Sequence, residues 1–124
     1  MASPGSPRTI LVCDDNPAHV RLLELVLGAH NYDVVTTCDG HEALTYLQSA
    51  TPDAIILDVQ MPYMSGFDVA RQLRRLTRLE RVPILFLTSL DDDATQRQAA
   101  EVGAHALMSK PVSGSGLLGH LARV

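Results

Sequence analysis

The chain has 124 residues, a hydrophobic share of 46% and a formal net charge of −4. This length suits one domain with its own core, and the composition is that of an ordinary soluble globular protein. The acidic balance argues against broad binding to a nucleic-acid backbone, which requires a basic face. No apolar run approaches the ~20 residues that a membrane helix needs.

The first eight residues are rich in proline, glycine and serine and contain no apolar signal core. We expect residues 1–8 to be a disordered lead-in without an export signal, and residues 9–124 to form the domain. Cys13 and Cys38 are therefore expected to be reduced thiols. The five histidines lack metal-ligand spacing and are interpreted as scattered surface or half-buried side chains.

Short apolar runs alternate with helical patterns along the domain. Strands are expected at 9–13, 33–37, 54–57, 83–87 and 106–108. Helices are expected from Pro17 after the cap Asn16 to about Asn31, from Asp39 and Glu42 to Thr51, at 66–76 after the cap Ser65, from 91–93 to about 102, and from Ser113 onward. The strands are apolar nearly throughout, which indicates burial on both faces. Right-handed crossovers then produce a parallel sheet with helices on both sides.

Two charged clusters have structural interpretations. Arg71, Arg74, Arg75 and Arg78 gather late in the third helix, where cations suit the helix dipole. We interpret them as a solvated helix end rather than a partner patch. The acidic triplet 91–93 is interpreted as helix capping, because three consecutive carboxylates cannot all face one ion from a helix start.

Polar side chains follow or close four of the expected strands. Asp14 and Asp15 follow the first strand, Asp58 follows the third, Thr88 follows the fourth, and Lys110, the only lysine, follows the fifth. In an open α/β sheet these ends converge on one crevice. Three carboxylates there would suit a hard divalent cation, and Mg²⁺ fits best. A carboxylate beside Mg²⁺ can act as a nucleophile toward phosphorus, and an amine and a hydroxyl can stabilise the phosphoryl oxygens.

The segments that carry these residues resemble the receiver domain of two-component response regulators, of the chemotaxis type. The matching motifs are ILVCDDNP at 10–17, IILDVQMPYMSG at 55–66, ILFLTS at 84–89 and GAHALMSKP at 103–111. The resemblance covers about residues 9–124. It implies a flavodoxin-like (βα)5 three-layer sandwich, with a doubly wound five-stranded parallel sheet in the order 2-1-3-4-5.

The resemblance also implies roles for the acidic residues. Asp58 would be the phosphoacceptor. Asp15, Asp58 and the backbone carbonyl of Gln60 would bind Mg²⁺ directly, and Asp14 would help to hold the ion, partly through water.

Further roles follow from the same resemblance. Thr88 and Lys110 would bind the phosphoryl group, and the Lys110–Pro111 peptide bond would be cis. Thr88 and Leu107 are the switch positions. Leu107 replaces the aromatic residue that is usual in the family, and we expect it to fill the same space, while signalling runs through shifts of the nearby loop and fourth helix.

The implied function is a cytoplasmic switch rather than an enzyme that turns over an outside substrate. The phosphoryl donor would be a phosphohistidine on a sensor histidine kinase or a histidine phosphotransfer protein. The receiver would be either a stand-alone regulator or part of a longer protein, and any output domain would lie outside this sequence. The face used for pairing by transcription-factor receivers lacks their charge pattern, so we expect a monomer or weak dimer, without direct contact to nucleic acid or membrane. Gln60 and Leu90 flank the site, and the apolar Leu90 predicts slow self-dephosphorylation.

Two other functions are consistent with parts of the pattern. A Mg²⁺-dependent phosphohydrolase of the haloacid-dehalogenase type would need a second aspartate two residues after the nucleophile, where this chain has Gln60. A degenerate receiver could act as a constitutive binding module. The intact set of Asp58, Thr88 and Lys110 argues against that alternative.

Overall fold

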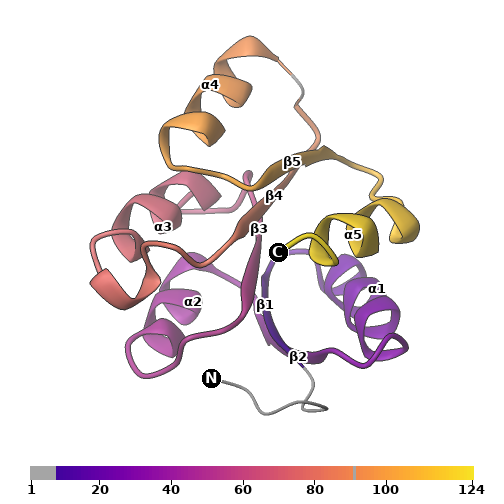
Figure 1. Cartoon of the computed structure of the whole chain (residues 1–124). Helices are drawn as coiled ribbons and strands as arrows, with labels where there is room; N and C mark the ends of the chain where they lie inside the picture. The colour runs from indigo at the N-terminus through magenta and orange to yellow at the C-terminus, as the bar shows by residue number, and fades with distance from the viewer. Residues whose placement is uncertain (1–7, 91) are drawn as a thin grey trace.

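The computed structural model describes residues 8–90 and 92–124, which form a parallel sheet covered by helices on both faces (Figure 1). The elements are β1 Thr9–Cys13, α1 Pro17–Gly28, β2 Asp33–Thr37, α2 Gly40–Leu47, β3 Ala54–Asp58, α3 Gly66–Leu73, the 3₁₀ turn η1 Thr77–Leu79, β4 Ile84–Thr88, α4 Asp93–Glu101, β5 Ala106–Ser109 and α5 Gly114–Leu121. The strand order is β2-β1-β3-β4-β5. The expected fold class and strand order are therefore confirmed.

The sheet register brings the polar strand ends to one edge. Cys13 of β1 lies opposite Leu57 of β3, so the next residues along the two strands, Asp14 and Asp58, come side by side. On the other side of β3, Asp58 lies opposite Leu87, one residue before Thr88. All five strands are parallel, and their carboxyl ends therefore share this edge.

Two apolar cores lie on opposite faces of the sheet. Leu11, Ile55 and Phe86 point to the face covered by α2, α3 and α4. Alternate strand residues, such as Ile10 and Ile56, point to the face covered by α1 and α5. Because successive side chains of a strand point to opposite faces, a strand between two helical layers must be apolar at nearly every position.

Side chains that accept hydrogen bonds from backbone amides begin most of the helices. The Asn16 side chain accepts from the amides of Ala18 and His19 at 3.0 and 3.3 Å. Ser65 and Asp68 form a reciprocal capping box at the start of α3. Asp92 accepts from the Thr95 amide at 2.8 Å, as expected for a helix cap. Asp91 of the same triplet and residues 1–7 of the predicted lead-in lie outside the described residues.

The end of α3 corrects two expectations. The helix stops at Leu73 rather than residue 76, and the chain turns back through η1. The Arg74 guanidinium donates to the carbonyls of Leu79 and Val82 at 2.8 and 2.7 Å, and to those of Val102 and Gly103 at 3.2 Å. The interpretation of a solvated helix end is wrong for Arg74, because the turn leaves carbonyl groups that its five N–H donors satisfy.

Arg78 has a similar structural role. It donates to the Ala50 carbonyl at 2.8 Å and to the Thr51 hydroxyl at 3.0 Å, and also to the carbonyl of Leu47. These bonds hold the end of α2 against η1. Arg78 is therefore also a link between elements rather than part of a free cationic surface.

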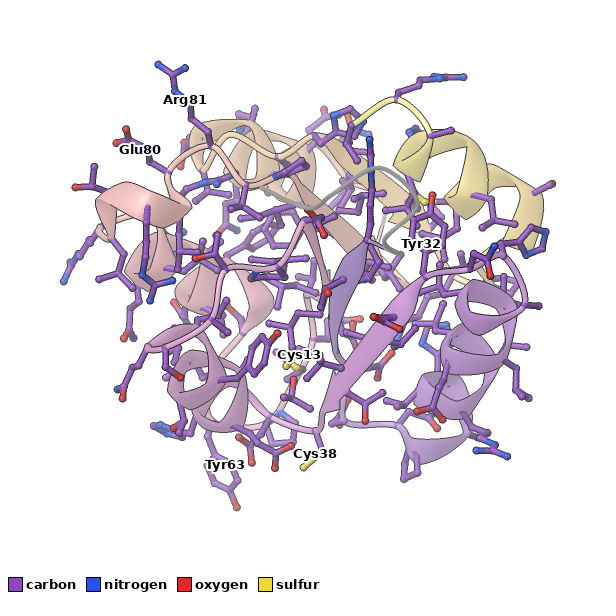
Figure 2. The ribbon with its side chains drawn as sticks, turned by 60° about the horizontal axis from the view of Figure 1, so that its bottom comes forward. Cys13, Tyr32, Cys38, Tyr63, Glu80 and Arg81 are labelled. Carbon is purple, nitrogen blue, oxygen red and sulfur yellow. The ribbon has the colours of Figure 1, made fainter. Side chains whose placement is uncertain are left out.

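Both cysteines are free, and they occupy different environments. Cys13 is buried and Cys38 is exposed. Figure 2 shows the sulfur of Cys38 at the surface and that of Cys13 inside the molecule. Within the described ranges, no helix combines the length and apolar character needed to cross a membrane.

Candidate functional site

Three carboxylates meet at the carboxyl ends of β1 and β3. Asp14 and Asp58 are buried, with 1% and 3% of their surfaces exposed, while Asp15 is exposed. One oxygen from each of the three lies within 4.8 Å of the others. The structure therefore brings together the acidic residues that the sequence singled out, with one of them open to solvent.

Asp58 is held by two donors from this chain. Its Oδ1 accepts from the Gln60 amide at 3.2 Å, and its Oδ2 accepts from Lys110 Nζ at 3.0 Å. Burial raises the pKa of Asp58 above its ordinary value, and the charge of Asp14 adds to the rise, although the Lys110 hydrogen bond opposes it. The ionised carboxylate is consequently less stable here than in water.

The pKa of Asp14, unlike that of Asp58, is lowered by its surroundings. Its Oδ1 accepts from the Asn16 amide at 3.0 Å, and its Oδ2 contacts His19 Nδ1 and, at 3.5 Å, Lys110 Nζ. Burial works to raise the pKa of Asp14, but the hydrogen bonds from His19 and Asn16 and the Lys110 charge together lower it. The sequence does not reveal the contact of His19, because helical spacing places this residue in the first turn of α1 but does not tell where its ring points.

Lys110 provides the positive charge of the site. Burial works to lower the pKa of Lys110, yet the hydrogen bond and charge of Asp58, together with the charge of Asp14, raise it. The amine therefore stays protonated. The Lys110 amide donates to the Thr88 carbonyl at 2.7 Å, and the Lys110–Pro111 bond is cis.

Thr88 is fully buried at the end of β4. Its Oγ1 accepts from the Leu90 amide at 2.9 Å, and a hydroxyl that accepts in this way can still donate its own proton. Leu107 lies opposite Phe86 in the β4–β5 register and is half-buried against the core under α2, α3 and α4. On the rim, the exposed Ser89 hydroxyl donates to the side-chain oxygen of Gln60.

The loop after β3 folds tightly against the site. A Cβ at Gly66 would lie 2.4 Å from the Asp58 carbonyl oxygen, so only glycine fits at the start of α3. The Gly66 amide donates to the Val59 carbonyl at 3.0 Å. In the same loop, Tyr63 is fully exposed with φ 68° and projects from the molecule in Figure 2.

The donor set fits a hard divalent cation. Carboxylate oxygens converge from two adjacent strands, and the exposed Asp15 leaves one side open for water and a ligand. Oxygen-only coordination is typical of Mg²⁺, whereas zinc sites use histidine and cysteine. The neighbouring Lys110 adds a positive charge beside Asp58, which suits a group that carries several negative oxygens.

Comparison with known proteins identifies the family. The sequence profile described as the response regulator receiver domain matches residues 10–122. The chain belongs to this family. It is 34% identical to the chemotaxis protein CheY4 of Vibrio cholerae, whose structure superposes with a TM-score of 0.91 and covers 95% of this chain and 98% of that one. It is 43% identical over 103 residues to the response regulator PleD of Caulobacter vibrioides.

Another solved relative is the receiver domain of a sensor histidine kinase from Pseudomonas aeruginosa, which has a magnesium ion coordinated in its active-site cleft. That domain is 27% identical, with a TM-score of 0.87, and the match covers 94% of this receiver and 96% of that one. Several curated relatives are much longer than this chain. It spans 19% of the protein RcaC of Microchaete diplosiphon, 23% of PleD and 43% of the transcriptional regulator PhoP of Bacillus subtilis.

Proposed function

We propose that this receiver accepts a phosphoryl group on Asp58 in a Mg²⁺-dependent reaction and changes conformation to control a downstream partner or domain. The supporting observation is the burial of Asp58 between the acids Asp14 and Asp15 and the ammonium of Lys110. Phosphorylation of a carboxylate in this setting gives an acyl phosphate, whose negative charge Lys110 and a bound cation can neutralise. Proximity and charge neutralisation are the main requirements of phosphoryl transfer.

Each residue has a distinct part in the proposed reaction. An Asp58 oxygen attacks the phosphorus of a phosphohistidine, an O–P bond forms, the N–P bond breaks, and the donor imidazole takes up a proton. Mg²⁺ would be held by Asp14, Asp15, Asp58 and the Gln60 carbonyl, and supplies charge neutralisation for the phosphoryl oxygens. Lys110 transfers its hydrogen bond from Asp58 Oδ2 to a phosphoryl oxygen.

The conformational change on phosphorylation would follow from the same contacts. Thr88 would turn its hydroxyl to the phosphoryl group, which requires the Leu90 amide to lose its present acceptor. Residues 89–90 after β4 would therefore take two arrangements of different phosphate affinity, which is all that a population shift needs. Leu107, which packs against the core on the face of α2, α3 and α4, would accommodate the change without a bulky ring.

The proposal also covers the phosphoryl donor, the oligomeric state and the lifetime of the phosphoryl group on Asp58. The donor is a sensor histidine kinase or a histidine phosphotransfer protein in the cytoplasm, and the receiver works as a monomer or weak dimer that binds neither nucleic acid nor membrane. Leu90, 47% exposed beside the site, offers no polar side-chain group to orient an attacking water. Self-dephosphorylation is therefore slow, and the domain is a phosphoacceptor rather than a phosphatase.

Incubation with acetyl phosphate and Mg²⁺ followed by intact-mass measurement tests the proposal. A single phosphoryl adduct is expected, and it should disappear in Asp58→Asn and when Mg²⁺ is chelated. Sustained phosphate release without an adduct would instead indicate a phosphohydrolase, and no change at all would indicate a constitutive binding module. Loss of the adduct within seconds after donor removal would contradict the slow self-dephosphorylation.

A further inference from the structure

His19 is a half-buried imidazole in contact with the acidic site. It lies in the first turn of α1, and its side chain is 14% exposed. Nδ1 contacts Asp14 Oδ2, the same oxygen that lies 3.5 Å from Lys110 Nζ. The histidine therefore joins the donors that surround one of the proposed metal-holding carboxylates.

The chemistry of the contact assigns the proton. An ionised carboxylate can only accept, so Nδ1 must carry the hydrogen that it shares with Asp14. The other ring nitrogen, Nε2, is buried, and among the residues that the structure describes it has no hydrogen-bond partner. The Asp14 contact is thus the polar interaction that orients this ring. The buried Nε2 without a hydrogen bond costs free energy of folding.

Asp14 depends on these donors for its orientation. The Asn16 amide holds Oδ1 at 3.0 Å, and His19 holds Oδ2. Without His19, the nearest remaining donor to Oδ2 is Lys110, which also bonds Asp58 at 3.0 Å. Asp14 would then turn toward the lysine and compete with Asp58 for it, and the three carboxylates would lose their common orientation.

We propose that His19 is a positioning residue of the Mg²⁺ site, which holds the Asp14 carboxylate in the orientation that the ion requires and leaves the shorter Lys110 hydrogen bond to Asp58. This inference rests on the proposed function, because it presupposes a metal at the three acids. Groups that hydrogen-bond to metal ligands typically change metal affinity by about 10–100-fold when they are removed.

Two variants of similar size separate the hydrogen bond from the bulk of the ring. In His19→Asn the amide nitrogen takes nearly the place of Nδ1 and can donate to Asp14. In His19→Leu a methyl group takes that place and cannot donate. The Mg²⁺ dissociation constant of each protein is measured by titration of backbone amide signals in NMR spectra, and the dispersion of the same spectra reports whether each variant is folded.

His19→Leu should bind Mg²⁺ at least about tenfold more weakly than the wild type, and His19→Asn should remain close to it. Unchanged binding in His19→Leu, or equal weakening in both variants, would overturn the inference while leaving the proposed function intact. Absence of Mg²⁺ binding by the wild type would instead overturn the proposed function, and this inference with it.

A second measurement needs no variant. The ¹⁵N shifts of the His19 ring in the wild-type protein report which ring nitrogen carries hydrogen. A protonated Nδ1 supports the inferred contact, and a bare Nδ1 overturns it even if His19→Leu fails to fold.

Discussion

Among the residues that the structure describes, two clusters of possible metal-ligating side chains lie at the carboxyl edge of the sheet, and one of them is largely buried. In the first, Asp14, Asp15 and Asp58 place carboxylate oxygens within 4.8 Å of one another, and two of the three are buried. The ammonium of Lys110 stands 3.0 Å from one of these buried acids. The first cluster therefore combines repulsion between acids with a compensating cation.

The second cluster consists of Cys38, Asp39 and Glu42, after β2, and its ligand atoms also lie within 4.8 Å of one another. Its acids serve the start of α2. The Asp39 side chain accepts from the Glu42 amide at 2.8 Å, and Glu42 accepts from the amide and thiol of Cys38 at 3.2 and 3.3 Å. These oxygens satisfy backbone donors at a helix N-terminus, where negative charge is favourable.

The comparison shows that proximity of acids does not by itself make a reactive site. In the second cluster, the acidic side chains accept hydrogen bonds from backbone amides. In the first cluster, burial destabilises the ionised Asp58, and a cation or a covalent modification can relieve that cost.

Removal of the cation from the first cluster should have the largest effect. Lys110→Met keeps a side chain of similar length but removes the charge that neutralises the phosphoryl oxygens. The rate of phosphorylation by acetyl phosphate, followed by intact mass, should fall by about 10²–10³-fold. The control is Arg81→Met, at an exposed position before β4 on the opposite edge of the sheet (Figure 2), which should react at the wild-type rate. Equal rates for both variants would remove Lys110 from the proposed chemistry.

Neutralisation of an acid should act differently in the two clusters. A carboxyl group whose pKa is raised by folding contributes stability at low pH, and that contribution is lost as the pH rises through its folded-state pKa. Because burial raises the pKa of Asp58 above its ordinary value, Asp58→Asn should be more stable than the wild type at neutral pH. The gain should shrink as the pH falls through the raised folded-state pKa of Asp58, and it should be gone once the pH is below the ordinary pKa of an aspartate.

Urea unfolding at neutral and acid pH measures this difference. Asp39→Asn is the control, because asparagine caps a helix about as well as aspartate, and its stability should change little. A loss of stability in Asp58→Asn at neutral pH would show that the Lys110 ion pair outweighs burial.

The smallest effect concerns the thiol of the second cluster. The hydrogen bond and charge of Glu42 raise the pKa of Cys38, so Glu42→Gln should lower it and increase the alkylation rate at neutral pH by a few-fold. Cys13 should not interfere, because burial raises its pKa to about 12 and shields its sulfur. Labelling of the folded protein, followed by mass spectrometry, should modify one cysteine. Unchanged kinetics would mean that Glu42 does not control this thiol.

Local patterns predicted most of the architecture. Apolar strands, the Asn16 and Ser65 caps and the left-handed Asn31 at φ 68° all correspond to the structure. The strand limits shifted by one residue at places such as Asp58, which closes β3 rather than following it. Helix α3 ended early because its limit depends on the turn that Arg74 ties to distant carbonyl groups, and no local pattern encodes those partners.

The sequence by itself determined two things: the alternation of buried strands with capped helices, and the position of four polar residues at strand ends (Asp14, Asp58, Thr88 and Lys110). Both depend on side-chain periodicity and on neighbouring residues. Tertiary structure decided which donors each carboxylate receives. The contact of His19 with Asp14 and the sharing of Lys110 between two buried acids arise only when elements far apart in the chain pack together. Hydrogen bonding and burial depend on that packing, and so does the difference in pKa between Asp14 and Asp58.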